Sequence, residues 1–241
     1  MPTFTKHPFF LWGLVAILVL PALVIATLLA LNSVDTEVTD ADREAIEALG
    51  LSPDKCNAPE SIDDELRCIR HVQQNVFELL PDTTCAFDKG NSAHGAADYV
   101  DRGYGCCYDR ATLIEQTLRK HDFQVRRAAV YKRQSSPHSY LLPGIPSHAL
   151  SEVKTREGWV AVDSIEPFIA ADDDHRIFTL SELRDAITAQ SVDDQTFGEA
   201  IPSNFFDGEF VYIYGVYSRH GYFFEPHIPV PEVAWSEFAL F

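Results

Sequence analysis

Two adjacent cysteines, Cys106 and Cys107, stand where a helix is expected to begin, directly after Gly105. Consecutive helical side chains point about 100° apart, so the two thiols face different surroundings. Cys107 belongs to the core-facing stripe of that helix, which consists of Cys107, Ala111, Ile114 and Leu118. A helix N-terminus and a neighbouring imidazole both favour a thiolate, lowering a thiol pKa from about 8.5 into the range of roughly 3.5 to 7.5.

A nucleophilic thiol needs a base, and an imidazole base needs a third group that fixes its tautomer. His148 and Asp163 lie on two neighbouring strand-like runs and supply both. The sequence therefore indicates Cys107, His148 and Asp163 as candidate catalytic residues. The structural alternatives are a buried thiol at 107, a hydrogen-bonded strand histidine at 148 and a turn-capping carboxylate at 163.

Five cysteines in a chain exported to an oxidising compartment leave one outside the disulfides if the other four pair. We expect bridges between Cys56 and Cys68 and between Cys85 and Cys106, with Cys107 as the reactive thiol. A strained bridge between the adjacent Cys106 and Cys107 is the rarer alternative.

The strand-like runs around His148 and Asp163 are expected to form a hairpin, over 148–154 and 159–163. A four-residue loop at 154–157 puts His148 opposite Asp163 and Val153 opposite Gly158. A two-residue turn at 157–158 instead puts Asp163 opposite Glu152. The sequence does not choose between these registers.

Further elements follow from capping signals and periodicity. Ser61 with Asp64 opens an amphipathic helix that ends at Pro81, and Thr179 with Glu182 opens another that ends near Thr188. A short helix is expected at 40–49, a strand at 125–133 and a long loop at 82–105. The aromatic-rich tail from residue 205 onward is interpreted as core and sheet surface.

The run from Phe9 to Leu31 contains no charged residue and is long enough to cross a hydrocarbon layer of ~30 Å. It is either a cleavable signal peptide or an anchor, and the absence of a clear small-residue cleavage pattern favours the anchor. Lys6 before the run favours a cytoplasmic N-terminus. We expect a cytoplasmic segment (1–8), a transmembrane anchor (9–31), an acidic stalk (32–51) and one domain (52–241), held at the inner membrane and facing the periplasm or exterior.

The formal charge of −17 argues against a nucleic-acid partner and against docking on anionic lipid headgroups, since both require clustered Lys and Arg. The cysteines and histidines lack the spacing typical of zinc sites, so no metal and no other cofactor is expected.

Three blocks of the chain resemble, in order, those of the transglutaminase-like superfamily. The blocks are Gly105–Leu113, Ser147–Val153 and Gly158–Asp163, and the family patterns are Gly-x-Cys-x-Asp-x-Ala, His-Ala before a strand, and Trp-Val-x-x-Asp. Cys107 fits the first pattern, because Asp109 and Ala111 follow it at the family spacing, and Cys106 does not fit.

The resemblance covers about residues 101–168. It departs at Leu150, where the family often has an aromatic residue, and at Ser164, where proline often follows the aspartate. Neither departure involves the reacting groups.

This resemblance implies an α+β, papain-like fold, in which a nucleophile helix packs on an antiparallel sheet, here preceded by one N-terminal transmembrane helix. It also implies that Cys107 is the nucleophile, His148 its base and Asp163 the orienting group. We therefore expect a bacterial, membrane-anchored thiol enzyme that hydrolyses peptide or protein amides in the cell envelope. The alternatives are a protein-cross-linking transglutaminase and a non-catalytic binding or assembly module that keeps the fold.

Overall fold

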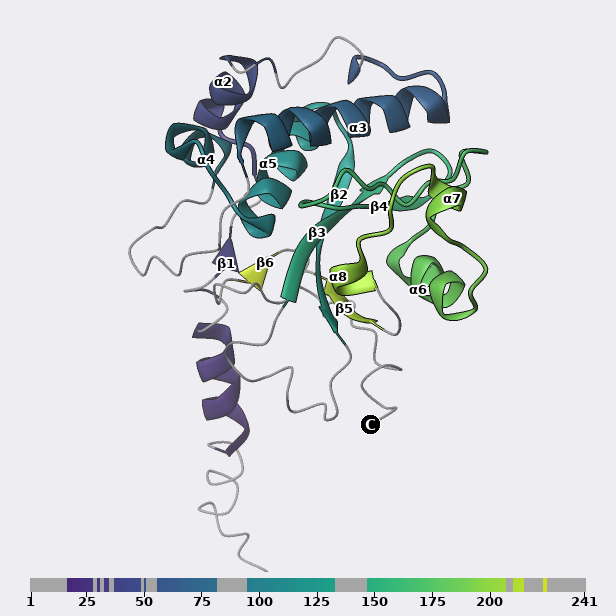
Figure 1. The fold of residues 1–241 in the computed structure, drawn as a ribbon. Helices are drawn as coiled ribbons and strands as arrows, with labels where there is room; N and C mark the ends of the chain where they lie inside the picture. The colour runs from purple at the N-terminus through teal and green to yellow at the C-terminus, as the bar shows by residue number, and fades with distance from the viewer. Residues whose placement is uncertain are drawn as a thin grey trace, which may run out of the picture. The chain divides into compact units, whose positions relative to one another are not determined.

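A computed structural model describes much of the chain, and the fold is drawn in Figure 1. The described residues are 17–27, 30, 33–34, 37–48, 50, 56–81, 95–132, 147–206, 210–214 and 223–224. The chain divides into two compact units, residues 1–33 and residues 34–241. The second unit contains the candidate site.

The second unit has an α+β architecture built around a four-stranded antiparallel sheet in the order β4-β3-β2-β5. These strands are β2 (Gln124–Lys132), β3 (Ser147–Lys154), β4 (Trp159–Val162) and β5 (Phe210–Tyr214). Two shorter strands, β1 (Ser33–Val34) and β6 (Phe223–Phe224), lie outside this sheet. The α+β class and the antiparallel sheet expected from the sequence are confirmed.

The described helices outside residues 17–27 are α2 (Asp40–Ala48), α3 (Ile62–Leu79), α4 (Ala96–Arg102), α5 (Cys107–Lys120), α6 (Leu180–Thr188), α7 (Asp194–Phe197) and α8 (Ser203–Phe206). α5 packs on β2 and β3, and α3 packs on α5. Successive strand residues face opposite sides of a sheet, and the two main apolar clusters follow that alternation. Val153 and Val162 belong to the cluster with α3 and α5, whereas Leu150 and Ala161 belong to the cluster with α6 and α8. The ribbon shows α3 and α5 on one side of the sheet and α6 and α8 on the other (Figure 1).

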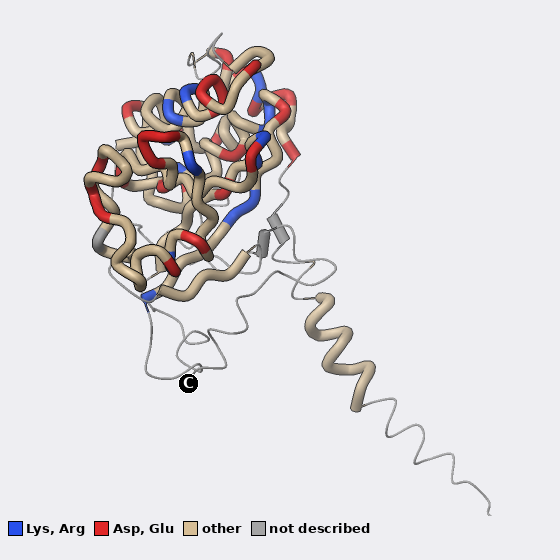
Figure 2. The backbone as a smooth tube through the Cα atoms, turned by 90° about the vertical axis from the view of Figure 1, so that its right-hand side faces the viewer, with Lys and Arg blue, Asp and Glu red and all other residues tan. Residues whose placement is uncertain are grey.

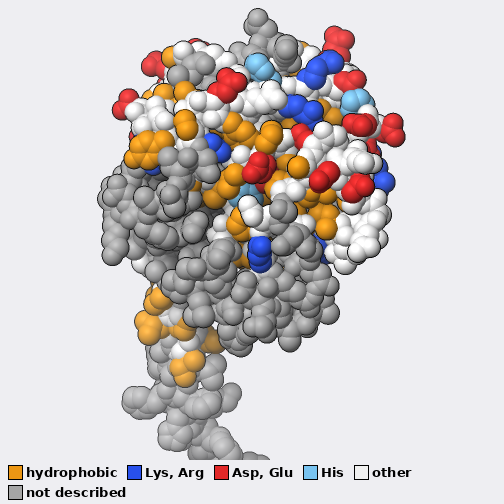
Figure 3. Space-filling view, in the orientation of Figure 1, with side chains coloured by type: hydrophobic (Ala, Val, Ile, Leu, Met, Phe, Trp, Pro, Cys, Tyr) orange, Lys and Arg blue, Asp and Glu red, His pale blue; other side chains and the backbone are white. Residues whose placement is uncertain are grey.

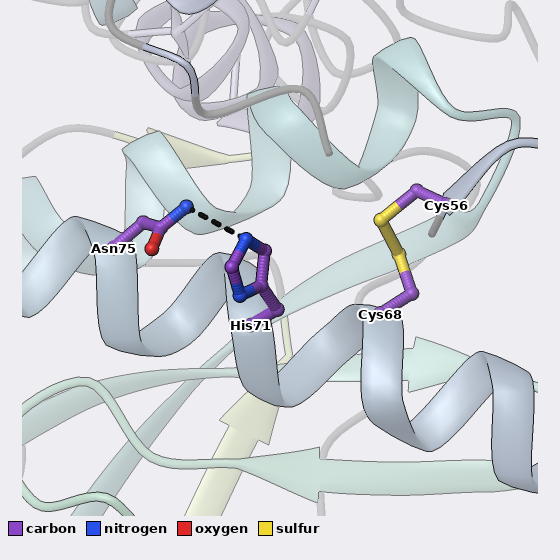
Figure 4. Close-up of a disulfide and its surroundings, with 4 residues drawn as sticks. All are labelled: Cys56, Cys68, His71 and Asn75. Carbon is purple, nitrogen blue, oxygen red and sulfur yellow. Dashed lines mark hydrogen bonds between the residues drawn. A yellow bond between two sulfur atoms is a disulfide. The ribbon is translucent and has the colours of Figure 1, made fainter. Parts of the chain in front are cut away.

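The predicted caps of α3 and α6 are confirmed. The hydroxyl of Ser61 accepts a hydrogen bond from the backbone N–H of Asp64 at 3.2 Å, and Thr179 does the same for Glu182 at 3.2 Å. A disulfide joins Cys68 on α3 to Cys56, as predicted (Figure 4). One turn further along the helix, the side chains of His71 and Asn75 are 3.2 Å apart.

The predicted loop over 82–105 is wrong for its last part, because α4 occupies 96–102. Two residues distant in sequence satisfy the first N–H groups of this helix: Asp42 accepts from Ala97 at 3.1 Å, and Gln116 accepts from Ala96. Gly103 ends the helix with a φ of 70°, the left-handed conformation that favours glycine. Residues 82–94 lie outside the described residues.

The predicted stalk over 32–51 also differs from the structure. α2 lies within it, yet Asp42 and Ile46 are buried and the helix packs on α4 and α5. The short helix itself was predicted correctly. The acidic composition of the segment concealed the residues that are buried in its described part, which are Val38, Asp42 and Ile46.

In the first unit, residues 17–27 form a helix with exposed apolar side chains, among them Ile17, Leu20 and Ile25 (Figure 3). This helix carries no charged residue, whereas acidic and basic positions are scattered over the second unit, the acidic ones more often (Figure 2). Within the described part of the chain, no helix has both the length and the apolar character needed to cross a bilayer. The predicted anchor over 9–31 lies partly outside the described residues.

Candidate active site

The candidate nucleophile, Cys107, is the first residue of α5, as predicted from the sequence. It is 5% exposed and takes part in no disulfide. Cys106 is the N-cap residue of the helix, and its backbone N–H donates to the carboxylate of Asp109 at 3.0 Å. Arg102 forms an ion pair with the same carboxylate at 2.7 Å. Because Cys107 is the first residue of α5, its thiol lies at the N-terminus of the helix, which carries a partial positive charge.

The turn before Cys107 depends on a glycine. A Cβ atom at Gly105 would lie 2.8 Å from the Cβ of Asp109 and 3.3 Å from the Cδ1 of Leu80. Both neighbours belong to packed elements, so this turn comes closer to α5 than any residue with a side chain permits.

Cys106 is disulfide-bonded, whereas Cys107 is not, so the predicted division between a structural and a reactive thiol agrees with the structure in that respect. Cys85, its predicted partner, lies outside the described residues.

The candidate base and orienting group are in direct contact. His148 lies on β3, and Asp163 directly follows β4; the Nε2 of His148 and the Oδ2 of Asp163 are 2.6 Å apart. The two side chains are 2% and 1% exposed. His148 shares its sheet face with Leu150, since alternate strand residues point the same way.

The hairpin that brings these two residues together has neither predicted register. Lys154 pairs with Trp159 and Ser151 pairs with Val162, so the connecting loop is Thr155–Gly158. The hydroxyl of Thr155 donates to the carbonyl of Gly158 at 2.9 Å and also accepts from its N–H at 3.3 Å. Because these hydrogen bonds close the loop at 155–158, it begins one residue later than the predicted four-residue loop at 154–157. Asp163 directly follows Val162, the last paired residue of β4.

Asp163 is held by more than its contact with His148. Its Oδ1 accepts from the backbone N–H groups of Ile165 at 2.6 Å and Glu166 at 2.8 Å. Its own carbonyl accepts from the buried side-chain amide of Gln73 on α3 at 2.8 Å. Both carboxylate oxygens are therefore occupied, and the orientation of Asp163 is determined before any substrate binds.

The electrostatics of the pair favour a charged imidazole. Burial alone would lower the pKa of His148. The negative charge and the hydrogen bond of Asp163 outweigh burial, Cys107 adds a smaller contribution in the same direction, and together they raise that pKa to about 10. For Asp163, burial opposes ionisation, yet the charge and hydrogen bond of His148 lower the pKa of the carboxyl group below its ordinary value. The pair is thus an imidazolium and a carboxylate at neutral pH.

Cys107 also acts on the His148 imidazole. Asp163 occupies Nε2, and Cys107 contributes to the raised pKa of His148 through hydrogen bonding and charge. Within the described residues, the remaining nitrogen, Nδ1, is buried and has no hydrogen bond of regular geometry. The structure thus brings together all three predicted residues.

A buried network fixes the nucleophile helix against the strand of the base. Glu115, two turns after Cys107 on α5, accepts from the hydroxyl of Ser151 on β3 at 2.8 Å and from the guanidinium of Arg127 on β2. Arg127 also donates to the hydroxyl of Thr112 at 2.8 Å. Because this network joins α5 to β2 and β3, it determines the position of Cys107 relative to His148.

Sequence reasoning missed the specific role of one aromatic residue. The ring of Phe205 on α8 stacks on the imidazole of His148, with 4.9 Å between centroids and 21° between planes. The expectation of core packing holds for its neighbours Phe206, Phe210, Tyr212 and Tyr214, which are buried. Tyr217, Tyr222 and Trp235 of this tail lie outside the described residues.

Among the described residues, no three His, Cys, Asp or Glu side chains are grouped closely enough to hold a metal ion. Comparison with known proteins found no matching family model, no similar curated protein and no similar solved structure.

Proposed function

We propose that the chain is a thiol-dependent amide hydrolase with a papain-like arrangement, in which Cys107 is the nucleophile, His148 the base and Asp163 the orienting group. The observation that carries this proposal is the buried 2.6 Å contact between His148 and Asp163, together with the action of Cys107 at the start of α5 on the same imidazole. The three blocks of sequence that resemble the transglutaminase-like superfamily support the same roles.

In the starting state, the thiol proton of Cys107 has moved to Nδ1 of His148, which leaves a thiolate and an imidazolium. The thiolate attacks the carbonyl carbon of an amide, and N–H groups at the start of α5 stabilise the oxyanion that forms. His148 then gives its Nδ1 proton to the leaving amine, the C–N bond breaks, and a thioester remains on Cys107. His148 takes a proton from water as the water attacks the thioester, which releases a carboxylic acid and restores the thiolate.

The experiment is turnover on a panel of peptides and envelope-derived protein amides, with amine incorporation measured in parallel. Cys107→Ala and His148→Ala should each abolish turnover, and the double variant should lose little more, because members of one catalytic unit are not additive. Cys106→Ser should keep its activity per folded molecule and lose mainly stability. Undiminished turnover in folded Cys107→Ala would contradict the proposal, and amine incorporation in place of hydrolysis would identify a transglutaminase.

The proposed location is the inner membrane, with the second unit facing the periplasm or exterior and acting on peptide or protein amides there. Support comes from the uncharged sequence 9–31 and from the exposed apolar side chains of helix 17–27. Cell fractionation tests this location. Full-length protein in the membrane fraction is expected, and a soluble form that begins near residue 32 would contradict it.

A further inference from the structure

Phe205 covers one face of the His148 imidazole. The two rings are nearly parallel, at 21°, with their centroids 4.9 Å apart. The face of an aromatic ring carries partial negative charge, so a cationic imidazolium is attracted to it. Phe205 is only half-buried and belongs to no other ring pair among the described residues.

The adjacent Phe206 has a different environment, although it lies on the same short helix. It is buried and packs on Phe210, with 5.0 Å between centroids, and on Phe168 at 6.1 Å. The backbone N–H of Phe206 donates to the carbonyl of Pro202 at 3.1 Å. Phe206 thus anchors α8 in the core, while Phe205 projects to His148.

We propose that Phe205 is a positioning residue of this site, whose ring holds the charged imidazole of His148 against Asp163 and keeps water from the bond between them. This inference rests on the proposed function. Exclusion of water strengthens a buried hydrogen bond, because the local dielectric constant is low. The ring thereby stabilises the imidazolium, and through it the thiolate of Cys107.

The effect of Phe205 on the pH profile of the site can be separated from the effects of the titratable groups around His148. The titratable groups that act on His148 are Asp163, after β4, and Cys107, on α5. Its cross-strand neighbour on β2 is Val130, which is opposite Tyr212 on β5. Because Phe205 on α8 is uncharged, its replacement alters the pH profile of the site without adding or removing a titrating group.

The test is the rate of alkylation of Cys107 by iodoacetamide between pH 4 and 9 in the full-length protein, followed by peptide mass spectrometry. Phe205→Met removes the ring at nearly constant volume, and Phe205→Leu is a second ring-free variant. Phe205→Tyr keeps the ring. Phe206→Met is the matched control, since it makes the same change one residue away in the core. Thermal unfolding of each variant reports its stability.

We expect the pH midpoint of Cys107 alkylation to rise by about one unit in both ring-free variants of Phe205, with about tenfold slower reaction at pH 5. Phe205→Tyr and Phe206→Met should keep the midpoint of the unmodified chain, although Phe206→Met lowers the melting temperature. An unchanged midpoint in Phe205→Met and Phe205→Leu, or an equal shift in Phe206→Met, would overturn the inference and leave the proposed function standing. A Cys107 that is inert at pH 5 in the unmodified chain would overturn both.

Discussion

His148 and Asp163 come from two neighbouring parts of one hairpin, and the Nε2 and Oδ2 atoms of the two residues are 2.6 Å apart in a site from which solvent is almost excluded. A charged pair at such depth is costly unless its geometry is good and its remaining atoms are hydrogen-bonded. Asp163 meets that condition through the N–H groups of Ile165 and Glu166.

Asp163→Asn removes the charge and keeps the shape of the side chain. We expect turnover to fall by about 10²- to 10⁴-fold, less than in Cys107→Ala, because a neutral imidazole still samples the productive tautomer. Asp163→Ala also leaves the N–H groups of Ile165 and Glu166 without their acceptor, so it should additionally reduce the free energy of unfolding. Activity per folded molecule and chemical denaturation separate the two effects. Equal turnover in Asp163→Asn and the unmodified chain would show that this carboxylate does not assist the base.

The pH dependence of stability follows from the raised pKa of His148. A histidine with a folded pKa of about 10 and an ordinary unfolded value near 6.5 stabilises the folded state fully below the unfolded value. That stabilisation should be lost progressively as the pH rises from about 6.5 through about 10. The free energy of unfolding, measured from pH 6 to 10 in a Cys107→Ser background, should therefore fall more steeply with His148 present than in a further His148→Gln variant. Parallel curves would show that folding does not raise the pKa of His148.

Gly105→Ala tests the close turn before the nucleophile. Its methyl group would meet Asp109 and Leu80, so we expect the start of α5 to shift, with a loss of about 1 to 3 kcal/mol in stability and slower alkylation of Cys107. Gly103→Ala is the matched control: its added Cβ would meet no atom within 4 Å, but its φ is +70°. That control should lose about 1 kcal/mol through backbone strain and keep the reactivity of Cys107. Equal reactivity in both variants would contradict the account of this turn.

Arg127→Met should destabilise the second unit by about 3 to 5 kcal/mol, because it leaves the carboxylate of Glu115 buried without its main partner. Combining it with Glu115→Gln should recover part of the loss, since both charges are then gone and an acceptor for the hydroxyl of Ser151 remains. Denaturant unfolding of the two single variants and the double variant measures the coupling. Strictly additive losses would show that the two side chains do not act as a pair.

Local signals in the sequence were sufficient where an element is specified by its own residues. The caps Ser61 and Thr179 and the position of Cys107 at the start of α5 were predicted correctly, because a helix begins where a side chain or a turn satisfies its first N–H groups. The strand positions of β2, β3 and β4 followed from their alternating residues to within one or two positions.

Contacts between residues that are distant in sequence, or that depend on the packing of whole elements, explain where the predictions from the sequence were wrong. The N–H groups of Ala96 and Ala97 at the start of α4 are satisfied by Gln116 and Asp42, which are remote in sequence. The local signal is only partial, because Asp98 accepts from the N–H of Gly95 but the N-cap glycine has no side chain to complete the cap. The register of the hairpin depends on the side chain of Thr155 within its loop. Phe205 and Phe206 are chemically identical neighbours, and only the packing of α8 determines which of them reaches His148.

The most direct test of the central claim is the rate at which iodoacetamide alkylates Cys107 at pH 5, measured by peptide mass spectrometry in the folded chain and in a folded His148→Ala variant. If Cys107 is a nucleophile whose thiolate is stabilised by the His148 imidazolium, the unmodified chain reacts readily at this pH. The variant should then react at least about tenfold more slowly. An inert Cys107 in the unmodified chain, or the same rate in both proteins, would contradict the account.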